Sequence, residues 1–346
     1  MKKILLSVSV GMVIASSAMA QDIHNTQYFA SPLTLNPALT GLTSADVRVA
    51  ASYRSQWSTV SANPYITGVA SFDMGVLKGK LPSGDALGVG LIAIYDKSGL
   101  GGLQNMTVGM SLAYHLGFGL DRQQHISFGI QGCLVQKSLD FNKLKFEDQF
   151  DVATGATPYT THEQFSNADL TYPDFNAGIM YSGKVSEHAT AYAGGSYYHL
   201  TQPIETFLQG SHKISGRYTG YLGGSFDMND NTVLYASGLY QSQASATEVM
   251  IGASVGFILN PGHEVDDYHK NTVLYLGSWY RYGDAVAPYV GFEWAKMQLG
   301  ISYDVNVSNF TPATGGNGAY ELTLIFNGHI NKGNYGPHYN WGCPKF

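Results

Sequence analysis

Apolar and polar residues alternate along most of this chain with a period of two. In residues 296–307, the apolar positions are Met297, Leu299, Ile301, Tyr303, Val305 and Val307. The positions between them are polar or small: Gln298, Gly300, Ser302, Asp304 and Asn306. Side chains of a β-strand point to opposite faces in turn, so this segment has one apolar face that must be buried in a core or in lipid. The pattern predicts an all-β protein.

Similar alternation recurs in a series of segments, most of which are long enough to cross a membrane as tilted strands of roughly 9–11 residues. The candidate strands are 46–55, 65–75, 87–95, 105–118, 124–138, 173–184, 188–200, 213–228, 231–243, 247–260, 271–283, 286–293, 296–307 and 318–328. An even number of strands closes a barrel with both chain ends on one side. We therefore expect a transmembrane antiparallel β-barrel of about 14 strands.

The connections between these segments fit a membrane barrel. Short connections such as 121–124 and 228–231 alternate with longer ones such as 56–64 and 201–212, and the longest covers 139–172. Outer-membrane barrels have short periplasmic turns and longer extracellular loops. The pattern thus predicts a multi-pass barrel in the outer membrane, with both mature termini in the periplasm.

Composition favours the membrane barrel over a soluble protein. Charged residues make up 13% of the chain, against roughly 25% in an average soluble domain. A soluble two-sheet sandwich would need a larger charged surface. The net charge of −6 argues against a nucleic-acid binder. Beyond the N-terminus, no run of 18 consecutive apolar residues is present, which excludes helical spans.

Both ends of the chain differ from the alternating middle. Lys2 and Lys3 precede an apolar run that ends at an A-x-A site, 18–20, as in a cleaved secretory signal. The predicted organisation is a signal peptide over 1–20, a periplasmic or lumen-plugging N-terminal arm over 21–45, an outer-membrane barrel over 46–328 and a periplasmic C-terminal tail over 329–346.

No segment assembles an active site. Residues 252–256 match G-x-S-x-G, but they lie mid-strand rather than at the strand-to-helix turn that the motif requires. His329, His338 and Cys343 share the tail without a zinc-type spacing. We expect no catalytic residue, metal site or cofactor. Cys133 and Cys343 could pair as a disulfide in an oxidising periplasm, or remain two independent thiols.

Several short sequence motifs are more specific than the alternation. They are QYFASP at 27–32, LNPALTG at 35–41, YRSQW at 53–57, YPDFNAG at 172–178, GGSYYHLTQP at 194–203, WYR at 279–281, GISYD at 300–304 and GAYEL at 318–322. In this order and spacing the chain resembles the PorP/SprF family of type IX secretion and gliding-motility membrane proteins of Bacteroidetes. The resemblance covers nearly the whole mature chain.

The resemblance implies a non-enzymatic outer-membrane barrel that supports export or surface attachment of a secreted protein. The partners it implies are outer-membrane lipid, type IX secretion components, a peptidoglycan-linked periplasmic protein and a large secreted adhesin or other cargo. The family has no catalytic residues to transfer to this chain.

Candidate residues for partner contact or for structure come from the motif words and from aromatic residues outside the strands. They are Asn36, Pro37, Tyr53, Arg54, Gln56, Trp57, Phe146, Phe150, Tyr159 and Trp341. For the motif residues a structural role is favoured: a turn at 36–38, and an aromatic girdle with an arginine anchored by lumen carboxylates at the end of the first strand.

Three functions compete at this point. A docking barrel predicts a plugged or narrow lumen, whereas an outer-membrane porin for small solutes predicts an open one, and about 14 strands leave room for a cavity. An outer-membrane hydrolase would need a Ser/His pair at the outer rim, and the sequence shows no convincing pair.

Overall fold

The computed structural model describes residues 22–77, 80–82, 84–119, 122–151, 154, 160–162, 169–207, 212–259 and 272–329. The predicted signal peptide and residues 330–346 of the predicted tail lie outside these ranges. No helix among the described residues is long and apolar enough to cross a membrane.

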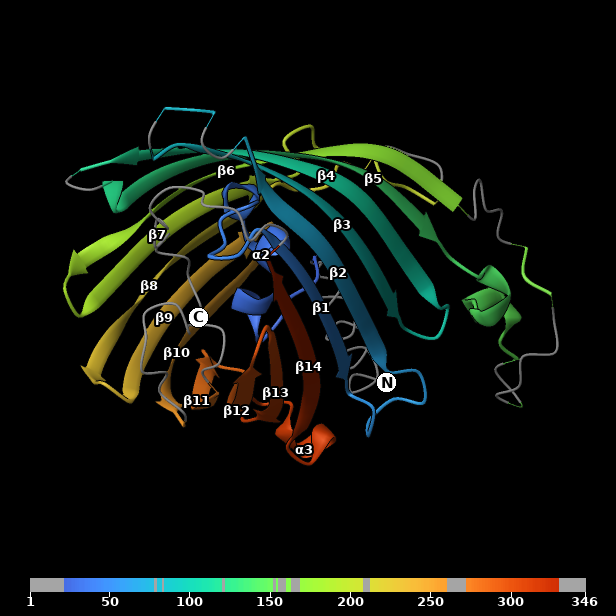
Figure 1. The fold of residues 1–346 in the computed structure, drawn as a ribbon. Coiled ribbons are helices and arrows are strands. Elements are labelled where there is room, and N and C mark those ends of the chain that lie inside the picture. Colours follow the sequence, from blue (N-terminus) through green and yellow to red (C-terminus); the bar gives the residue numbers. More distant parts are fainter. Residues whose placement is uncertain are drawn as a thin grey trace.

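The chain forms a closed barrel of antiparallel strands (Figure 1). The strands are β1 (Val47–Gln56), β2 (Tyr65–Val76), β3 (Ala86–Ser98), β4 (Leu103–Phe118), β5 (Gln124–Ser138), β6 (Asp169–Ser186), β7 (Ala189–Tyr198), β8 (Arg217–Asn229), β9 (Thr232–Gln243), β10 (Ala246–Ile258), β11 (Val273–Arg281), β12 (Ala285–Trp294), β13 (Met297–Asn306) and β14 (Asn317–Gly328). Each strand pairs with its neighbours in sequence, and β1 pairs with β14 along its whole length, Val47 opposite Gly328 and Gln56 opposite Ala319. The predicted all-β fold class, an antiparallel barrel of 14 strands, is confirmed.

Several predicted strand ends were wrong. The strand expected over 188–200 ends at Tyr198, because His199 adopts a left-handed backbone conformation with φ 60°. The next strand begins at Arg217 rather than at 213, so a longer loop joins β7 to β8. The expected loop after β3 shrinks to 99–102, because the ladder continues through Asp96 opposite Asn105 to Ser98 opposite Leu103.

The two faces of the wall differ as the alternation predicts. On β13, Ile301 and Tyr303 point outward and are 52% and 40% exposed, whereas Gln298, Ser302 and Asp304 point inward and are buried. An apolar exterior with a polar interior is the arrangement of a barrel in lipid. We call the end where β1 ends and β2 begins the loop end, and the opposite end the turn end.

Residues 22–46, here called the inner arm, lie inside the barrel (Figure 1). They contain three short helical turns, η1 (Tyr28–Ala30), α2 (Pro32–Leu35) and η2 (Pro37–Leu39). Proline occupies the first turn of α2 and of η2, where its missing N–H costs nothing. Asn36 caps η2, since its side-chain oxygen accepts a bond from the Ala38 N–H at 2.8 Å.

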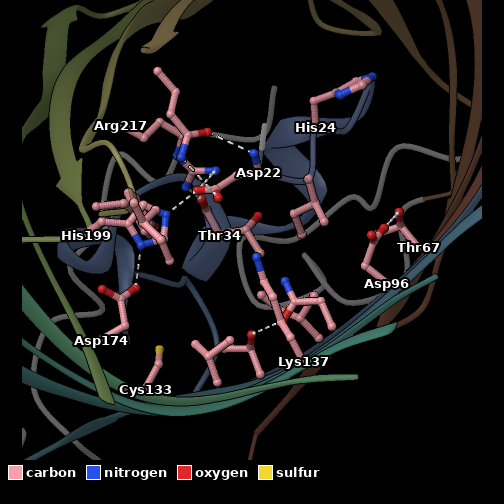
Figure 2. Close-up of a pocket in the computed structure, with 18 of the residues that line it drawn as sticks. Asp22, His24, Thr34, Thr67, Asp96, Cys133, Lys137, Asp174, His199 and Arg217 are labelled. Carbon is pink, nitrogen blue, oxygen red and sulfur yellow. Dashed lines mark hydrogen bonds and ion pairs between the residues drawn. The ribbon is translucent and has the colours of Figure 1, made fainter. Parts of the chain in front are cut away.

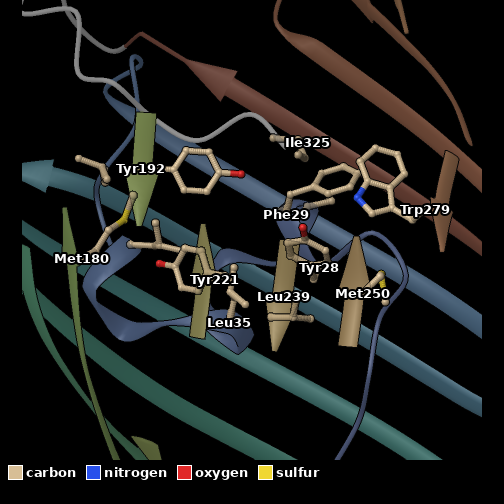
Figure 3. Close-up of a cluster of buried hydrophobic side chains, with 14 of the residues drawn as sticks. Tyr28, Phe29, Leu35, Met180, Tyr192, Tyr221, Leu239, Met250, Trp279 and Ile325 are labelled. Atoms are coloured by element: carbon tan, nitrogen blue, oxygen red, sulfur yellow. The ribbon is translucent and has the colours of Figure 1, made fainter. Parts of the chain in front are cut away.

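The core of the molecule lies between the inner arm and the wall, as Figure 3 shows. The Phe29 ring packs 5.0 Å from Trp279 and 5.7 Å from Tyr289, centroid to centroid. Met180, Tyr192, Tyr221, Leu239 and Met250 continue the same cluster along the wall. Burial of these aromatic side chains stabilises the arm inside the barrel through the hydrophobic effect, in addition to its hydrogen bonds.

Candidate functional site

A charged network anchors the first part of the inner arm to the wall. Arg54 on β1 contacts Asp304 on β13 at 2.8 Å and Glu321 on β14 at 3.2 Å. Arg281 on β11 contacts the same Asp304 at 2.9 Å. The Thr26 hydroxyl of the arm lies among these groups: it donates to Asp304 and accepts from both guanidiniums.

Glu321 holds the arm backbone directly. Its two carboxylate oxygens accept bonds from the Thr26 and Gln27 N–H groups at 2.8 and 3.0 Å. Asp304 and Glu321 are 2% and 1% exposed. These two acidic side chains on the inner face therefore do not lie in open water. They lie against the arm, where paired arginines offset the cost of burial.

The second half of the arm is hydrogen-bonded to β6, β7 and β8 across the ring, and to β2 beside β1. The Asn36 amide donates to the Ile179 and Gly195 carbonyls and to the Tyr221 hydroxyl at 3.0–3.2 Å. The Gly41 N–H donates to Asp73, which is also paired with Arg48 at 2.7 Å. The arm is thus fixed along its length rather than at one point.

Glycines in the wall make room for the arm. A Cβ added at Gly88 would overlap the Thr40 carbonyl, and one at Gly129 would overlap Ala38. A Cβ at Gly178 would overlap the Asn36 side chain. Because these inward positions accept no side chain, the wall and the arm are fitted to one another at backbone distance.

A cavity of about 450 Å³ lies between the inner arm and the loop end of the barrel (Figure 2). Its lining comes from the arm, through Asp22, Ile23, His24, Leu33 and Thr34, and from the loop-end halves of β1 to β9. The cavity is a vestibule that ends on the arm.

One wall of the vestibule carries a group of four residues, Asp22, Asp174, His199 and Arg217, that fixes the start of the arm to the wall. We call this group the latch. His199 contacts Asp174 through Nδ1 at 2.9 Å and Asp22 through Nε2 at 2.8 Å, and Arg217 contacts Asp22 at 3.3 Å. The left-handed backbone at His199 is unusual for a residue other than glycine, and such strain is concentrated at functional sites. Burial opposes a charge on His199, but hydrogen bonds and charges of Asp174 and Asp22 outweigh it and raise the pKa of His199 to about 9.

The sequence-predicted residues near the first strand fall in different environments. Asn36 and Pro37 are buried in the inner arm. Tyr53 points outward, 6.1 Å from the Tyr320 ring, while Arg54 points inward into the charged network. Gln56 lines the vestibule.

Trp57 lies at the rim of the loop end. Its backbone has φ 58°, and its ring packs edge-on against Tyr65 and Phe310 at 5.2 and 5.5 Å. Tyr65 and Phe310 are 38% and 44% exposed, so this aromatic trio is partly open to the outside.

The aromatic candidates outside the strands are not brought to the arm. Phe146 is half-buried and Phe150 is 53% exposed, in the segment between β5 and β6 that extends away from the ring in Figure 1. Tyr159 and Trp341 lie outside the described residues. Cys133 on β5 lines the vestibule, and its proposed pairing with Cys343 also falls outside the described residues.

Sequence reasoning missed most of the latch and the network. Asp22, Asp174, His199, Arg217 and Arg281 were not singled out as a group. The available signal was a charged residue at an inward position of a strand otherwise poor in charge. That signal identifies each residue as a candidate but does not predict which residue it contacts.

Comparisons with known proteins give a family for the chain. No curated protein matches it. Among solved structures, the toluene transporter TbuX of Ralstonia pickettii has a TM-score of 0.46 at 12% identity, over 86% of this chain and 92% of that one. The Omp33 outer membrane protein of Acinetobacter baumannii has 0.41 at 9% identity, over 83% and 100%. Both TM-scores lie below 0.5, so these likenesses carry no argument about function.

The family comparison covers most of the sequence. The model of the type IX secretion system membrane protein PorP/SprF matches residues 17–326. This match includes the inner arm, the latch and nearly all of the barrel. The chain therefore belongs to the PorP/SprF family of type IX secretion system membrane proteins.

Proposed function

We propose that this protein is a plugged outer-membrane barrel that docks type IX secretion or gliding components and supports export or surface attachment of a secreted protein. The observation that carries the proposal is the inner arm, which is buried inside the barrel and hydrogen-bonded to strands around the ring. A barrel filled by its own chain is suited to presenting surfaces to partners rather than to passing solutes.

The alternative, a porin for small solutes, needs a continuous water-filled path. Two charged seals oppose such a path. The Arg54–Asp304–Glu321 network closes the arm against β1, β13 and β14, and the Arg48–Asp73 pair closes it against β1 and β2. Both are more than 90% buried. Opening a channel would require these pairs to be broken, at a cost of several kcal/mol each.

The orientation follows from the family role and the loop lengths. We place the loop end outside the cell and the turn end in the periplasm, as in other outer-membrane barrels. Asp22, the first described residue, lies in the vestibule near the loop end. In this orientation Asp22 lies inside the barrel, on the loop-end side of the inner arm.

The test is a mild-detergent pulldown of the tagged full-length chain from its native membranes, followed by mass spectrometry. A tagged unrelated barrel from the same membranes serves as the control. Specific recovery of a peptidoglycan-binding periplasmic protein or a large secreted protein supports docking. A barrel that purifies alone, as the control does, contradicts it and favours the porin.

A further inference from the structure

An unpaired carboxylate lies in the wall of the vestibule. Asp96 on β3 accepts a bond from the Thr67 hydroxyl at 2.5 Å. Among the described residues, no cation forms an ion pair with Asp96. Lys137 lies two strands away in register, through Asn105, and interacts with Asp96 electrostatically without contact. Its Nζ is held by both oxygens of Glu205 at 2.7 and 2.9 Å. Asp96 therefore presents negative charge to the cavity.

A second carboxylate with spare capacity faces the cavity from the opposite wall. Asp174 is 3% exposed; its Oδ2 contacts His199, while its Oδ1 has no hydrogen-bond partner among the described residues. Figure 2 shows Asp174 and His199 on one side of the cavity and Asp96 with Thr67 on the other.

The basic residues of the vestibule are already matched. Arg54 is paired with Asp304 and Glu321, Arg217 with Asp22, and Lys137 with Glu205. An anionic ligand would have to displace one of these carboxylates. A cationic ligand meets Asp96 without breaking a pair.

Aliphatic side chains line the cavity beside Asp96, and we call them the ledge; those on β3 lie on its inner-arm side. Ile92, Ile94, Leu103 and Val135 line the cavity from β3, β4 and β5. At the rim, Trp57 and Tyr65 also line it, and aromatic faces attract cations. The ledge is suited to an apolar stem, and the rim to the passage of a positive charge.

We propose that the vestibule binds an alkylammonium or guanidinium cation on an aliphatic stem, with the charge at Asp96 and the stem along the ledge. A lysine or arginine side chain of a protein partner has this chemistry, and so does a free polyamine. Assigning the cation to a protein partner rests on the docking function proposed above; the site itself does not.

The first test uses diaminopentane as the probe, pentanediol as its uncharged match, and the full-length chain in detergent. Calorimetry should detect binding of diaminopentane and not of pentanediol. Asp96→Asn keeps the Thr67 hydrogen bond but removes the charge, and should weaken binding roughly tenfold or more, since a hydrogen bond to a charged group contributes about 1.5–3 kcal/mol. The control is Asp227→Asn, an exposed carboxylate at the turn-end part of β8, which should bind as the unchanged chain does.

Equal binding of the two probes, or full binding by a correctly folded Asp96→Asn variant, would overturn the proposal. Circular dichroism of both variants shows whether they fold. If Asp96→Asn does not fold, Asp96→Glu, which keeps the charge on a longer side chain, must retain preference for the amine.

A second pair of probes separates the two sources of the cation. A short glycine peptide with one central lysine is compared with the same peptide carrying norleucine. Binding of the lysine peptide identifies a protein side chain, and binding of diaminopentane alone identifies a free amine. If neither binds while the pulldown recovers its partner, this inference fails and the docking proposal stands. If diaminopentane binds and the barrel purifies alone, the reverse holds.

Discussion

At the scale of single residues, the barrel interior depends on charges that compensate one another. Arg54 is 3% exposed and Asp304 is 2% exposed, so this ion pair is buried away from water. Such a group is tolerated when its partner is in contact and its remaining hydrogen-bonding sites are used. The Thr26 hydroxyl donates a hydrogen bond to Asp304 and accepts one from Arg54, which links the wall network to the inner arm.

Replacing Arg54 with methionine should destabilise the protein strongly. The change leaves Asp304 and Glu321 buried with one cation fewer, and loss of one partner of a buried pair costs about 3–5 kcal/mol. The matched control is Lys143→Met, which breaks an exposed pair with Asp140 and should cost under about 1 kcal/mol. Denaturant unfolding in detergent measures both. Equal losses would show that the network does not hold the structure.

The latch predicts a pH dependence. Because the pKa of His199 is raised from near 6.5 to about 9, its contribution to stability is full below pH 6.5 and is lost as pH rises through 9. Burial would raise the pKa of Asp22, but Arg217 and His199 outweigh burial and hold it well below its usual value near 3.8. The Asp22 contribution is therefore lost only in strong acid.

Comparing His199→Gln with the unchanged chain tests this dependence. The difference in thermal midpoint should be largest near pH 6 and should shrink toward zero by about pH 10. His188→Gln, in the exposed β6–β7 turn, is the control and should show no such trend. A difference for His199→Gln that stays constant across this range would contradict the assignment of charge to the latch.

At the scale of elements, the inner arm and the wall strands depend on one another. Short helical turns such as α2 and η2 are too short to be stable alone, so their shape comes from the surfaces around them. The wall in turn has inward glycines on β3, β5 and β6, where the arm approaches. In a barrel without an arm, these inward positions would have room for a side chain and would not need to be glycine.

Gly178→Ala should therefore disturb the seat of the arm. Its Cβ would meet the Asn36 side chain, and overpacking of this kind costs about 1–3 kcal/mol. Gly220→Ala is the matched control, because a Cβ there meets nothing within 4 Å. Thermal unfolding of the two variants gives the comparison. Equal midpoints would mean that Asn36 moves aside freely.

At the scale of the whole molecule, the barrel is a closed wall around an arm from the same chain. The closure between β1 and β14 brings the arm, the first strand and the last strand together. The family match extends across both the arm and the barrel.

Electrical conductance in planar bilayers tests whether the arm plugs the lumen of the whole barrel. The intact chain should be nearly silent, because the arm and its charged pairs obstruct the lumen. Deleting residues 22–45 should produce stable openings. The vestibule-side variant Asp96→Asn, which leaves the arm in place, should stay as silent as the intact chain. Large, steady conductance of the intact chain would favour the porin.

The alternation predicted the strands because it is a local property. Each of the fourteen predicted segments corresponds to an observed strand. At His199 the local signal conflicts with a distant contact, and the strand ends early. His199 lies in an apparently continuous strand pattern, but its side chain is engaged by Asp22, which is 177 residues away. A pattern with period two contains no information about that contact.

The sequence by itself thus determined the number of strands, which face meets lipid, and the absence of a recognisable active-site motif. These follow from side-chain period, polarity and spacing, all of which are readable residue by residue. Tertiary structure alone decided that the inner arm lies in the lumen, that Arg54 meets residues 250 and 267 positions away, and that a vestibule remains above the arm. The reason is that barrel closure and register set which inward side chains become neighbours, and no local pattern specifies them.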